Sequence, residues 1–422
     1  MSEDWHGREL ELRLGNPGHG GFCVARHEGR VVFVRHGLPG ELVRATVTED
    51  RGGSFCRADA VEIVEPSADR VDPLCPISGP GGAGCCDFSH ATLPAQRAIK
   101  ASVVAEQLRR LAGVDRDVEV EDLPGTGNGT GWRSRVRLAV DADGRAGFHA
   151  YRSDRVVPDL LCPQPVPGTY AGLTERSWRP GGELQVTVDA DGVRHVVEIE
   201  PAHLTRTGRR SPGRRGATAR RAAVSRPRRE HPVIGGGRAV QRVGDREWEL
   251  SATGFWQAHR GAAERYSEVV ADWSGLGVGD VAWDLYGGVG VFAAALAAQV
   301  GERGAVLSVE SARGAVDDGR RALADLPQVR LEAARVEAAV SGLSGPVTTV
   351  VLDPPRSGAG RAVVESVAAA GPRTVVHIGC DPAAFGRDVG LFLGQGYRLD
   401  AVRAFDAFPL THHVECIARL VR

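Results

Sequence analysis

From about residue 247 onward, short apolar runs alternate with longer stretches that suit helices. Four of these runs read VAWDLY, AVLSVE, TTVVLD and TVVHIG, and stretches such as VFAAALAAQV lie between them. This alternation predicts βαβ units, which place their strands in one parallel sheet. The last residues, YRLDAVRAFDAFPLTHHVECIARLV, predict two further strands in an antiparallel hairpin. We therefore expect an α/β domain over residues 247–422.

The first 66 residues have a different pattern. Short alternating runs, among them ELELRLG and ELVRATVTED, are separated by Gly, Pro and Asn turns, which predicts several short strands. Strands at this spacing are typical of a small barrel, such as the oligonucleotide-binding barrels. A β-rich cap that binds no ligand is the alternative. We expect residues 1–66 to form this unit.

Residues 67–246 mix helical and strand patterns. A loop rich in Cys, Gly and Pro (72–91) precedes a helical pattern that has a proline near its start and Gly113 near its end. Antiparallel strands with an Asp-Gly turn follow. This range therefore predicts a central α+β domain.

Positive charge is concentrated in one segment. Ten arginines and no acid lie between Arg206 and Arg229, so this stretch carries +10 while the whole chain carries −1. The surrounding residues 205–232 contain almost no core-forming side chains, which predicts a disordered basic insertion. Such a segment suits RNA phosphates, with salt-dependent affinity. A solvated, dispensable loop is the other interpretation.

Composition excludes several classes of protein. No apolar run approaches the roughly 20 residues of a membrane span, so an integral membrane protein is excluded. The first residues, MSEDWH, lack the basic and apolar regions of a secretory signal. The eight cysteines are few and irregularly spaced, which disfavours a disulfide scaffold and fits a cytoplasmic protein.

A glycine-rich turn follows the first strand of the α/β region. In WDLYGGVGVFAAALA, Gly287, Gly288 and Gly290 leave the backbone open to close approach by a ligand. The spacing is not G-x-G-x-x-G, and the P-loop lysine is absent. Glu310 stands at the tip of the next strand, where an acid can accept hydrogen bonds from both ribose hydroxyls. These features favour an adenosine-containing ligand, with a turn made for packing alone as the alternative.

Three further residues stand where strands begin or end. Asp353 follows an apolar strand and precedes two prolines, which make the loop rigid. Cys380 ends a predicted parallel strand, the edge at which open α/β sheets bind ligands. A thiolate there is a candidate nucleophile, although a lone cysteine after an apolar strand is more often a packing residue. Glu415 begins a late strand and is a general-base candidate if it lies near Cys380.

Five ordered motifs give the sequence a resemblance to a known family. FWQAH, DLYGGVG, DPPRSG, HIGCDPAAFGRD and FPLTHHVE resemble motifs of the RNA uracil-5-methyltransferases, which use S-adenosylmethionine and modify tRNA or 23S rRNA. The N-terminal β unit resembles their TRAM domain. The resemblance covers most of the chain and leaves out the arginine-rich insertion. It implies a Rossmann-like class I methyltransferase domain, an N-terminal TRAM barrel and a central α+β domain.

The resemblance also implies roles for individual residues. It makes Cys380 the nucleophile and Glu415 the base. It places five further residues around the cofactor and the target base: Gln257, Tyr286, Gly288, Glu310 and Asp353. Addition of a thiolate to carbon 6 of uracil would turn the ring into an enolate whose carbon 5 attacks the methyl group. A base must then remove the proton from carbon 5, and the target base must leave its stack.

Family members often hold a 4Fe–4S cluster on four cysteines. The resemblance assigns this role to Cys75, Cys85, Cys86 and Cys162, although Ala83 stands where the family pattern has its second cysteine. Cys85 can substitute, but adjacent cysteines aim both sulfurs at one cluster only with backbone distortion. A zinc site or unligated thiols are the alternatives.

The expected function is methylation of carbon 5 of a uridine in structured RNA. The expected partner is therefore rRNA or tRNA, with no membrane, and the enzyme is expected to be a monomer. Two alternatives remain at this point: an RNA-binding protein whose methyltransferase domain is inactive, and a methyltransferase acting on carbon 5 of cytosine.

Overall fold

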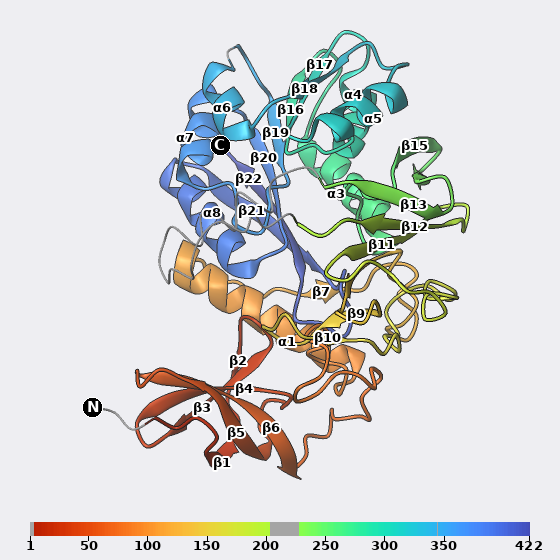
Figure 1. The fold of residues 1–422 in the computed structure, drawn as a ribbon. Helices are drawn as coiled ribbons and strands as arrows, with labels where there is room; N and C mark the ends of the chain where they lie inside the picture. Colours follow the sequence, from red (N-terminus) through yellow and green to blue (C-terminus); the bar gives the residue numbers. More distant parts are fainter. Residues whose placement is uncertain (1–3, 203–227, 344) are drawn as a thin grey trace, which may run out of the picture.

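An eight-stranded sheet forms the largest layer of the protein (Figure 1). The computed structural model describes residues 4–202, 228–343 and 345–422. Seven of the eight strands come from the C-terminal part of the chain and one from the middle. In spatial order they are β18 (Val329–Ala333), β17 (Ala305–Glu310), β16 (Val281–Leu285), β19 (Thr349–Leu352), β20 (Thr374–Gly379), β22 (Glu415–Val421), β21 (Arg398–Phe405) and β7 (Val120–Glu121).

The sheet is parallel from β18 to β20, whereas β22 pairs antiparallel with both β20 and β21. This confirms the predicted parallel sheet and the predicted antiparallel hairpin. The order of the strands reverses between β16 and β19, and ligands bind outside the carboxyl ends of the strands at such a point. Strand β18 was not predicted, because the strands of this domain were identified from mostly apolar runs, whereas Arg330 and Glu332 interrupt this strand at the edge of the sheet.

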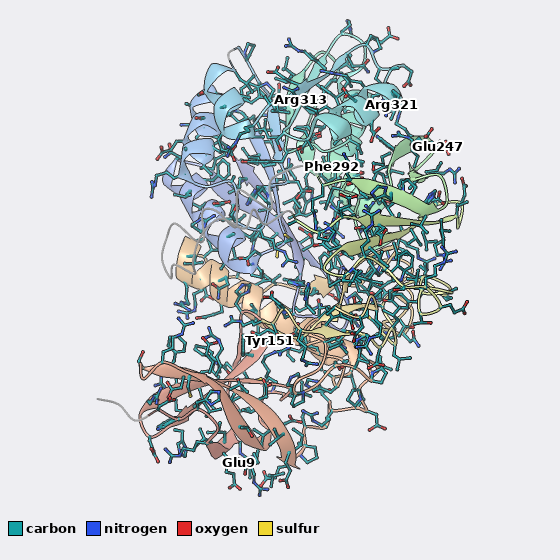
Figure 2. The ribbon with its side chains drawn as sticks, viewed as in Figure 1. Glu9, Tyr151, Glu247, Phe292, Arg313 and Arg321 are labelled. Carbon is teal, nitrogen blue, oxygen red and sulfur yellow. The ribbon has the colours of Figure 1, made fainter. Side chains whose placement is uncertain are left out.

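Helices cover both faces of this sheet, so its strands are buried on both sides. Val350 belongs to one cluster of buried apolar residues and its neighbour Val351 to another, as the alternation of side chains in a strand requires. Helix α3 (Ala262–Ser274) precedes β16. The helices that follow the parallel strands are α4 (Val291–Val300), α5 (Arg313–Ala322), α6 (Val336–Ala339), α7 (Arg361–Ala370) and α8 (Pro382–Gly394). Figure 2 shows the side chains between these layers and labels Phe292 of α4.

The N-terminal residues form the predicted all-β unit. Six strands make one sheet in the order β1-β5-β6-β4-β3-β2, around a core of buried apolar side chains. The strands are β1 (Glu9–Arg13), β2 (Pro17–Gly18), β3 (Phe22–His27), β4 (Arg30–Arg35), β5 (Leu42–Asp50) and β6 (Phe55–Glu65). We call residues 5–65 the N-terminal β unit.

The middle of the chain contains the predicted helix and the predicted antiparallel strands. Helix α1 (Leu93–Gln107) continues into a π-helical turn (Leu108–Ala112) and ends at Gly113, whose φ of 68° suits glycine. The remaining strands of this region are β8 (Arg135–Val140), β9 (Ala146–His149), β10 (Val156–Val157), β11 (Glu183–Val188), β12 (Arg194–Ile199), β13 (Glu230–Ile234), β14 (Arg238–Val243) and β15 (Arg246–Ser251).

The end of the predicted disordered insertion is ordered. Of residues 205–232, those up to 227 lie outside the described residues. Glu230, however, starts β13, which pairs with β12 and faces Ile199. Arg228 donates a hydrogen bond to Glu183 of β11 at 2.7 Å. The prediction of disorder is therefore wrong for these last residues, because the edge of a neighbouring sheet supplies partners that composition does not reveal.

The middle region also contributes to the C-terminal sheet. Val120 and Glu121 of β7 pair in parallel with Ala404 and Phe405 of β21. The division of the chain at 66/67 and 246/247 stays a prediction. Within the described residues, no helix combines the length and apolar character needed to cross a membrane.

A buried ion pair joins helix α1 to the end of β21. Lys100, the one lysine of the sequence, is 1% exposed and lies 2.5 Å from Asp406 Oδ1, which is also fully buried. Lys100 Nζ also donates to the carbonyl of Phe408 at 3.0 Å. Burial lowers the pKa of Lys100, and the charge of Asp406 opposes this shift. The pair therefore fixes the start of the segment that leads to Glu415.

We expect Lys100→Met to lower the free energy of unfolding by about 3–5 kcal/mol, because it leaves Asp406 buried and unpaired. Urea denaturation followed by circular dichroism measures the change. Arg109→Met is the control, since Arg109 pairs with Glu106 on the surface and should cost less than about 1 kcal/mol. Equal unfolding midpoints for the two variants would contradict this prediction.

Candidate active site

A pocket of about 1070 Å³ lies at the carboxyl edge of the C-terminal sheet. It is lined from the loop after β15, the turn after β16, the ends of β17, β19 and β20, and the start of β22. Seven residues predicted from the sequence line this pocket together: Gln257, Tyr286, Gly288, Glu310, Asp353, Cys380 and Glu415. The structure thus brings together residues that lie up to 158 positions apart, while their individual roles stay predictions.

The turn after β16 requires a glycine at position 287. A Cβ there would lie 2.1 Å from Ser308 Oγ and 2.4 Å from Asp284 Oδ2. Gly288 and Gly290 have φ of 57° and 80°, values that side chains disfavour. The backbone can therefore pass close to β17 and leave space at the start of α4 for a ligand.

Glu310, at the tip of β17, faces this turn with an oriented carboxylate. Its Oε2 accepts a hydrogen bond from the Gly288 backbone N–H at 3.3 Å, and its Oε1 accepts one from Ala312 at 2.7 Å. The Ser311 hydroxyl donates to Oε1 at 3.0 Å. These bonds leave acceptor capacity on a carboxylate that lines the pocket, as a ligand with a diol requires.

The register of the sheet makes Cys380 and Glu415 neighbours. Gly379, the last residue of β20, pairs with Cys416 of the antiparallel strand β22. The next residues outward are Cys380, directly after β20, and Glu415, the first residue of β22. Cys380 is partly exposed in the pocket, whereas Glu415 is only 3% exposed. A nucleophile and a base candidate therefore stand side by side without any requirement for loop closure.

Burial and like charges raise the pKa of three acidic groups of the pocket, Cys380, Asp353 and Glu415. Burial raises the pKa of Cys380 to about 12, with further increases from Glu415 and Asp353, and Arg356 opposes them. Burial and the nearby Asp284 raise the pKa of Asp353 to about 7. The pKa of Glu415 lies well above its ordinary value because of burial and Asp353. The pocket is thus short of positive charge.

Two residues not predicted as site residues add cationic and aromatic groups. Arg356 follows the two prolines after Asp353, and its Nη2 lies 3.4 Å from His413 Nε2. Both side chains line the pocket. One sequence signal could have identified these two residues. Arg356 lies in DPPRSG, three residues after Asp353, and His413 lies in FPLTHHVE, two residues before Glu415. Sequence periodicity carries no information on where such loop side chains point.

The loop that carries Gln257 is anchored by a buried arginine. Arg135 of β8 is 8% exposed and donates to the backbone carbonyls of Ala252 and Gly254. Phe255, on the same loop, lines the pocket and is 69% exposed. The loop therefore presents an aromatic face at the pocket mouth.

The cysteine-rich loop forms a separate group of thiols. The sulfurs of Cys75, Cys86 and Cys162 all lie within 4.8 Å of one another, and the three residues are buried. Cys85 is outside this triad but hydrogen-bonds with Cys162 and Cys86, and these bonds lower its pKa to about 4. The four cysteines predicted as ligands therefore lie in one group. Of the adjacent pair, Cys86 belongs to the triad of close sulfurs, whereas Cys85 contacts the triad from outside it. Four thiolates are a donor set that fits an iron–sulfur cluster or zinc.

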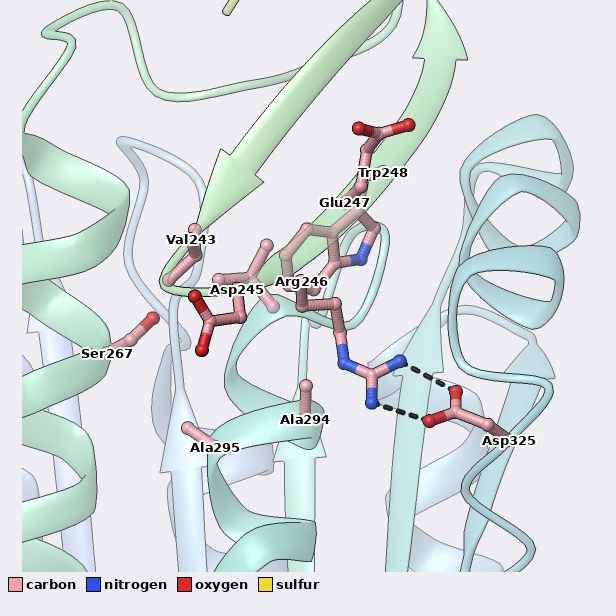
Figure 3. A pocket seen from close by; sticks show the side chains of 10 residues that line it. Val243, Asp245, Arg246, Glu247, Trp248, Ser267, Ala294, Ala295 and Asp325 are labelled. Carbon is pink, nitrogen blue, oxygen red and sulfur yellow. Dashed lines mark hydrogen bonds and ion pairs between the residues drawn. The ribbon is translucent and has the colours of Figure 1, made fainter.

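A second hollow of about 570 Å³ lies beside the β14–β15 hairpin (Figure 3). Arg246 forms two hydrogen bonds to the Asp325 carboxylate there, at 2.7 and 2.8 Å. The seven predicted pocket residues do not line this hollow.

Comparison with known proteins gives two family matches. Residues 5–61 match the TRAM domain, and residues 242–422 match the tRNA (uracil-5-)-methyltransferase family. An uncharacterized RNA methyltransferase of Streptomyces avermitilis is 43% identical, over 98% of each chain. The 23S rRNA (uracil(1939)-C(5))-methyltransferase RlmD of Alkalilimnicola ehrlichii is 33% identical, over 97% of this chain and 96% of its own. The chain belongs to the RNA uracil-5-methyltransferase family.

A solved structure supports the fold of this methyltransferase. The Pyrococcus abyssi tRNA (uracil-54, C5)-methyltransferase, solved with S-adenosyl-L-homocysteine, superposes with a TM-score of 0.67 at 21% identity. The match covers 98% of this chain and 99% of the other. The predicted class I fold with an N-terminal TRAM domain is therefore confirmed.

We expect alkylation of Cys380 by iodoacetamide to rise about tenfold per pH unit from pH 7 to 10, because its raised pKa leaves little thiolate at neutral pH. Mass spectrometry of the peptide that contains Cys380 measures the rate in the ligand-free methyltransferase. Cys380→Ser identifies labelling of other cysteines. A plateau in the rate below pH 9 would show that the thiol ionises far more easily than its surroundings imply.

Proposed function

We propose that this methyltransferase transfers a methyl group from S-adenosylmethionine to carbon 5 of a uridine in rRNA or tRNA, through a covalent adduct with Cys380. The observation that carries the proposal is the neighbouring position of Cys380 and Glu415, in one pocket with the glycine turn and Glu310. The two named relatives act on uracil in 23S rRNA and in tRNA. Their names support the reaction and leave both RNA classes open.

The glycine turn and Glu310 are the proposed cofactor site. S-adenosylmethionine supplies an electrophilic methyl group on a positively charged sulfur. Glu310 would accept hydrogen bonds from the ribose hydroxyls of the cofactor, and the absence of side chains at Gly287 and Gly288 would allow it to approach the backbone. Tyr286, Gln257 and Asp353 line the same pocket as this site and Cys380.

Cys380 and Glu415 perform separate steps. The Cys380 thiolate adds to carbon 6 of the uracil, and the electron pair moves to carbon 5, which then takes up the methyl group. Glu415 next removes the proton from carbon 5, the 5,6 double bond re-forms and the thiolate leaves. Its raised pKa makes Glu415 a stronger base than an exposed carboxylate once it is ionised. The uridine must leave its stack to reach this pocket.

Substitution of the two residues separates the steps. Cys380→Ala removes the nucleophile and should lower methyl transfer at least about 1000-fold, since nucleophile and adduct are lost together. Glu415→Gln leaves the thiol and should accumulate a methylated protein–RNA adduct on a denaturing gel. Transfer from labelled S-adenosylmethionine to unmodified RNA is the measurement.

The outcomes discriminate among functions. Full methyl transfer by Cys380→Ala would refute the covalent route. Failure of the unaltered protein to methylate any RNA would favour an RNA-binding protein with an inactive domain. Mass spectrometry of digested RNA distinguishes 5-methyluridine from 5-methylcytidine and thereby tests the target base.

We also propose that Cys75, Cys85, Cys86 and Cys162 hold a 4Fe–4S cluster. Two contacts support this donor set: the sulfurs of Cys75, Cys86 and Cys162 lie within 4.8 Å of one another, and Cys85 hydrogen-bonds with Cys162 and Cys86. The Gln164 side chain donates to Cys86 Sγ at 3.1 Å, the kind of hydrogen bond that accompanies cluster sulfurs.

We expect protein purified without oxygen to be brown and to contain about four iron and four sulfide per chain, the content of such a cluster. Cys162→Ser and Cys85→Ser should each lower the iron content, because each removes a ligand. Cys23→Ser is the control, since Cys23 is buried in the N-terminal β unit. Stoichiometric zinc in place of iron, or unchanged iron in Cys85→Ser, would contradict the four-ligand assignment.

A further inference from the structure

We propose that the N-terminal β unit positions the nucleophile and the base relative to each other, through its own His19 and through Asp87 of the cysteine-rich loop, which the unit holds. The proposal rests on the function proposed above and adds a role to the TRAM domain beyond contact with RNA. Two separate contacts carry it, one to the segment before Glu415 and one to the residue after Cys380.

The first contact runs from Arg35 through Asp87 to His412. Arg35, the last residue of β4, is 3% exposed, and its Nη2 donates to Asp87 Oδ1 at 3.0 Å. The ring of Tyr151 lies under the Arg35 guanidinium at 3.6 Å, and Figure 2 labels Tyr151 where the N-terminal β unit meets the rest of the chain. Asp87 Oδ2 accepts from His412 Nδ1 at 2.6 Å and from the His412 backbone N–H at 3.3 Å.

This contact fixes the backbone and the ring of one residue at once. Asp87 is only 3% exposed, and its two carboxylate oxygens bond to different residues, so its side chain ties Arg35 to His412. Gly21 of the N-terminal β unit also abuts Asp87, because a Cβ at Gly21 would lie 3.0 Å from the Asp87 side chain.

His412 lies three residues before Glu415, and its neighbour His413 lines the pocket, so the position of His412 affects the pocket. The ring centroids of His412 and His413 are 4.1 Å apart, and His413 lines the pocket beside Arg356. The His413 backbone N–H donates to Thr411 Oγ1 at 3.1 Å, which keeps this segment in a fixed turn. Displacement of His412 would therefore displace the segment that delivers the Glu415 carboxylate.

The second contact reaches the nucleophile. His19, between β2 and β3, has its Nε2 3.1 Å from Asp381 Oδ2. Asp381 directly follows Cys380 and caps helix α8, since its Oδ1 accepts from the backbone of Ala383 and Ala384 at 3.0 and 2.9 Å. Its carboxylate thus connects the N-terminal β unit to the turn that sets the Cys380 backbone.

The two contacts lie next to each other. The rings of His19 and His412 meet edge to face with centroids 6.3 Å apart. One edge of the N-terminal β unit therefore touches both catalytic segments, which belong to different strands of the C-terminal sheet. A unit that served only to bind RNA would have no need of bonds to residues adjoining Cys380 and preceding Glu415.

The contacts predict different kinetic defects. Asp87→Ala should leave adduct formation near normal and prolong the lifetime of the methylated adduct about 10–100-fold, the effect expected of a displaced base. His19→Ala should slow adduct formation about tenfold through the Asp381 turn. Asp87→Asn retains a hydrogen-bond acceptor and should restore part of the loss, as a positioning role requires.

The experiment uses single-turnover kinetics with the full-length protein, unmodified RNA and labelled S-adenosylmethionine. Adduct formation and decay are followed on denaturing gels at saturating RNA, and RNA affinity is measured by filter binding. His412→Ala in combination with Asp87→Ala should add less than a twofold further change, because both ends of one contact are already lost. Arg8→Met removes the exposed Arg8–Glu28 pair of the same unit and is the matched control.

Rates are normalised to the folded fraction measured by circular dichroism. Weaker RNA binding with unchanged single-turnover rates in Asp87→Ala and His19→Ala would overturn the proposal. It would show that the N-terminal β unit acts in RNA binding alone. Additive effects of Asp87→Ala and His412→Ala would also overturn it. Absence of any adduct or methylated uridine with the unaltered protein would instead refute the proposed function, so the two failures are distinguishable.

Discussion

The antiparallel direction of β22 is the constraint on which the active site depends. In a sheet of parallel strands, only carboxyl ends meet at the edge where ligands bind. Because β22 runs the other way, its first residue stands at this edge, and the pairing of Gly379 with Cys416 sets Glu415 beside Cys380. A register slip would turn the Glu415 side chain to the opposite face. The hairpin at the end of the chain thus creates a pair of functional groups that a purely parallel sheet could not.

The electrostatics of the pocket complement this geometry. Cys380, Asp353 and Glu415 line one pocket; Asp353 raises the pKa of both other groups, and Glu415 raises the pKa of Cys380. Arg356 is the nearby group that opposes these shifts. A cationic ligand in the same space would favour ionisation of the thiol by direct attraction. Activation of the nucleophile would then be coupled to occupancy of the pocket, so a reactive thiolate would not persist in the empty protein.

Sequence reasoning succeeded where one local pattern determines the outcome. Strands β16, β17, β19 and β20 are continuous apolar runs, and the residues at their ends reach one edge by topology alone. Strand β7 was missed because two residues carry no periodicity and their pairing with β21 spans almost 300 positions. The contacts of Asp87 and His19 were missed for the same reason, since each joins segments that are distant in sequence. Composition likewise assigned Glu230 to a flexible segment although a neighbouring strand orders it.

The burial of Lys100 has a consequence for how the surface of this enzyme can be altered. With its one lysine sealed against Asp406, the folded chain offers no side-chain amine to acetylating enzymes or to amine-directed crosslinkers among the described residues. Exposed positive charge is carried instead by guanidinium groups of arginine, which stay protonated at any physiological pH. Each guanidinium can form two parallel hydrogen bonds to phosphate oxygens. The charge of the exposed arginines is therefore not removed by modifications that neutralise lysine.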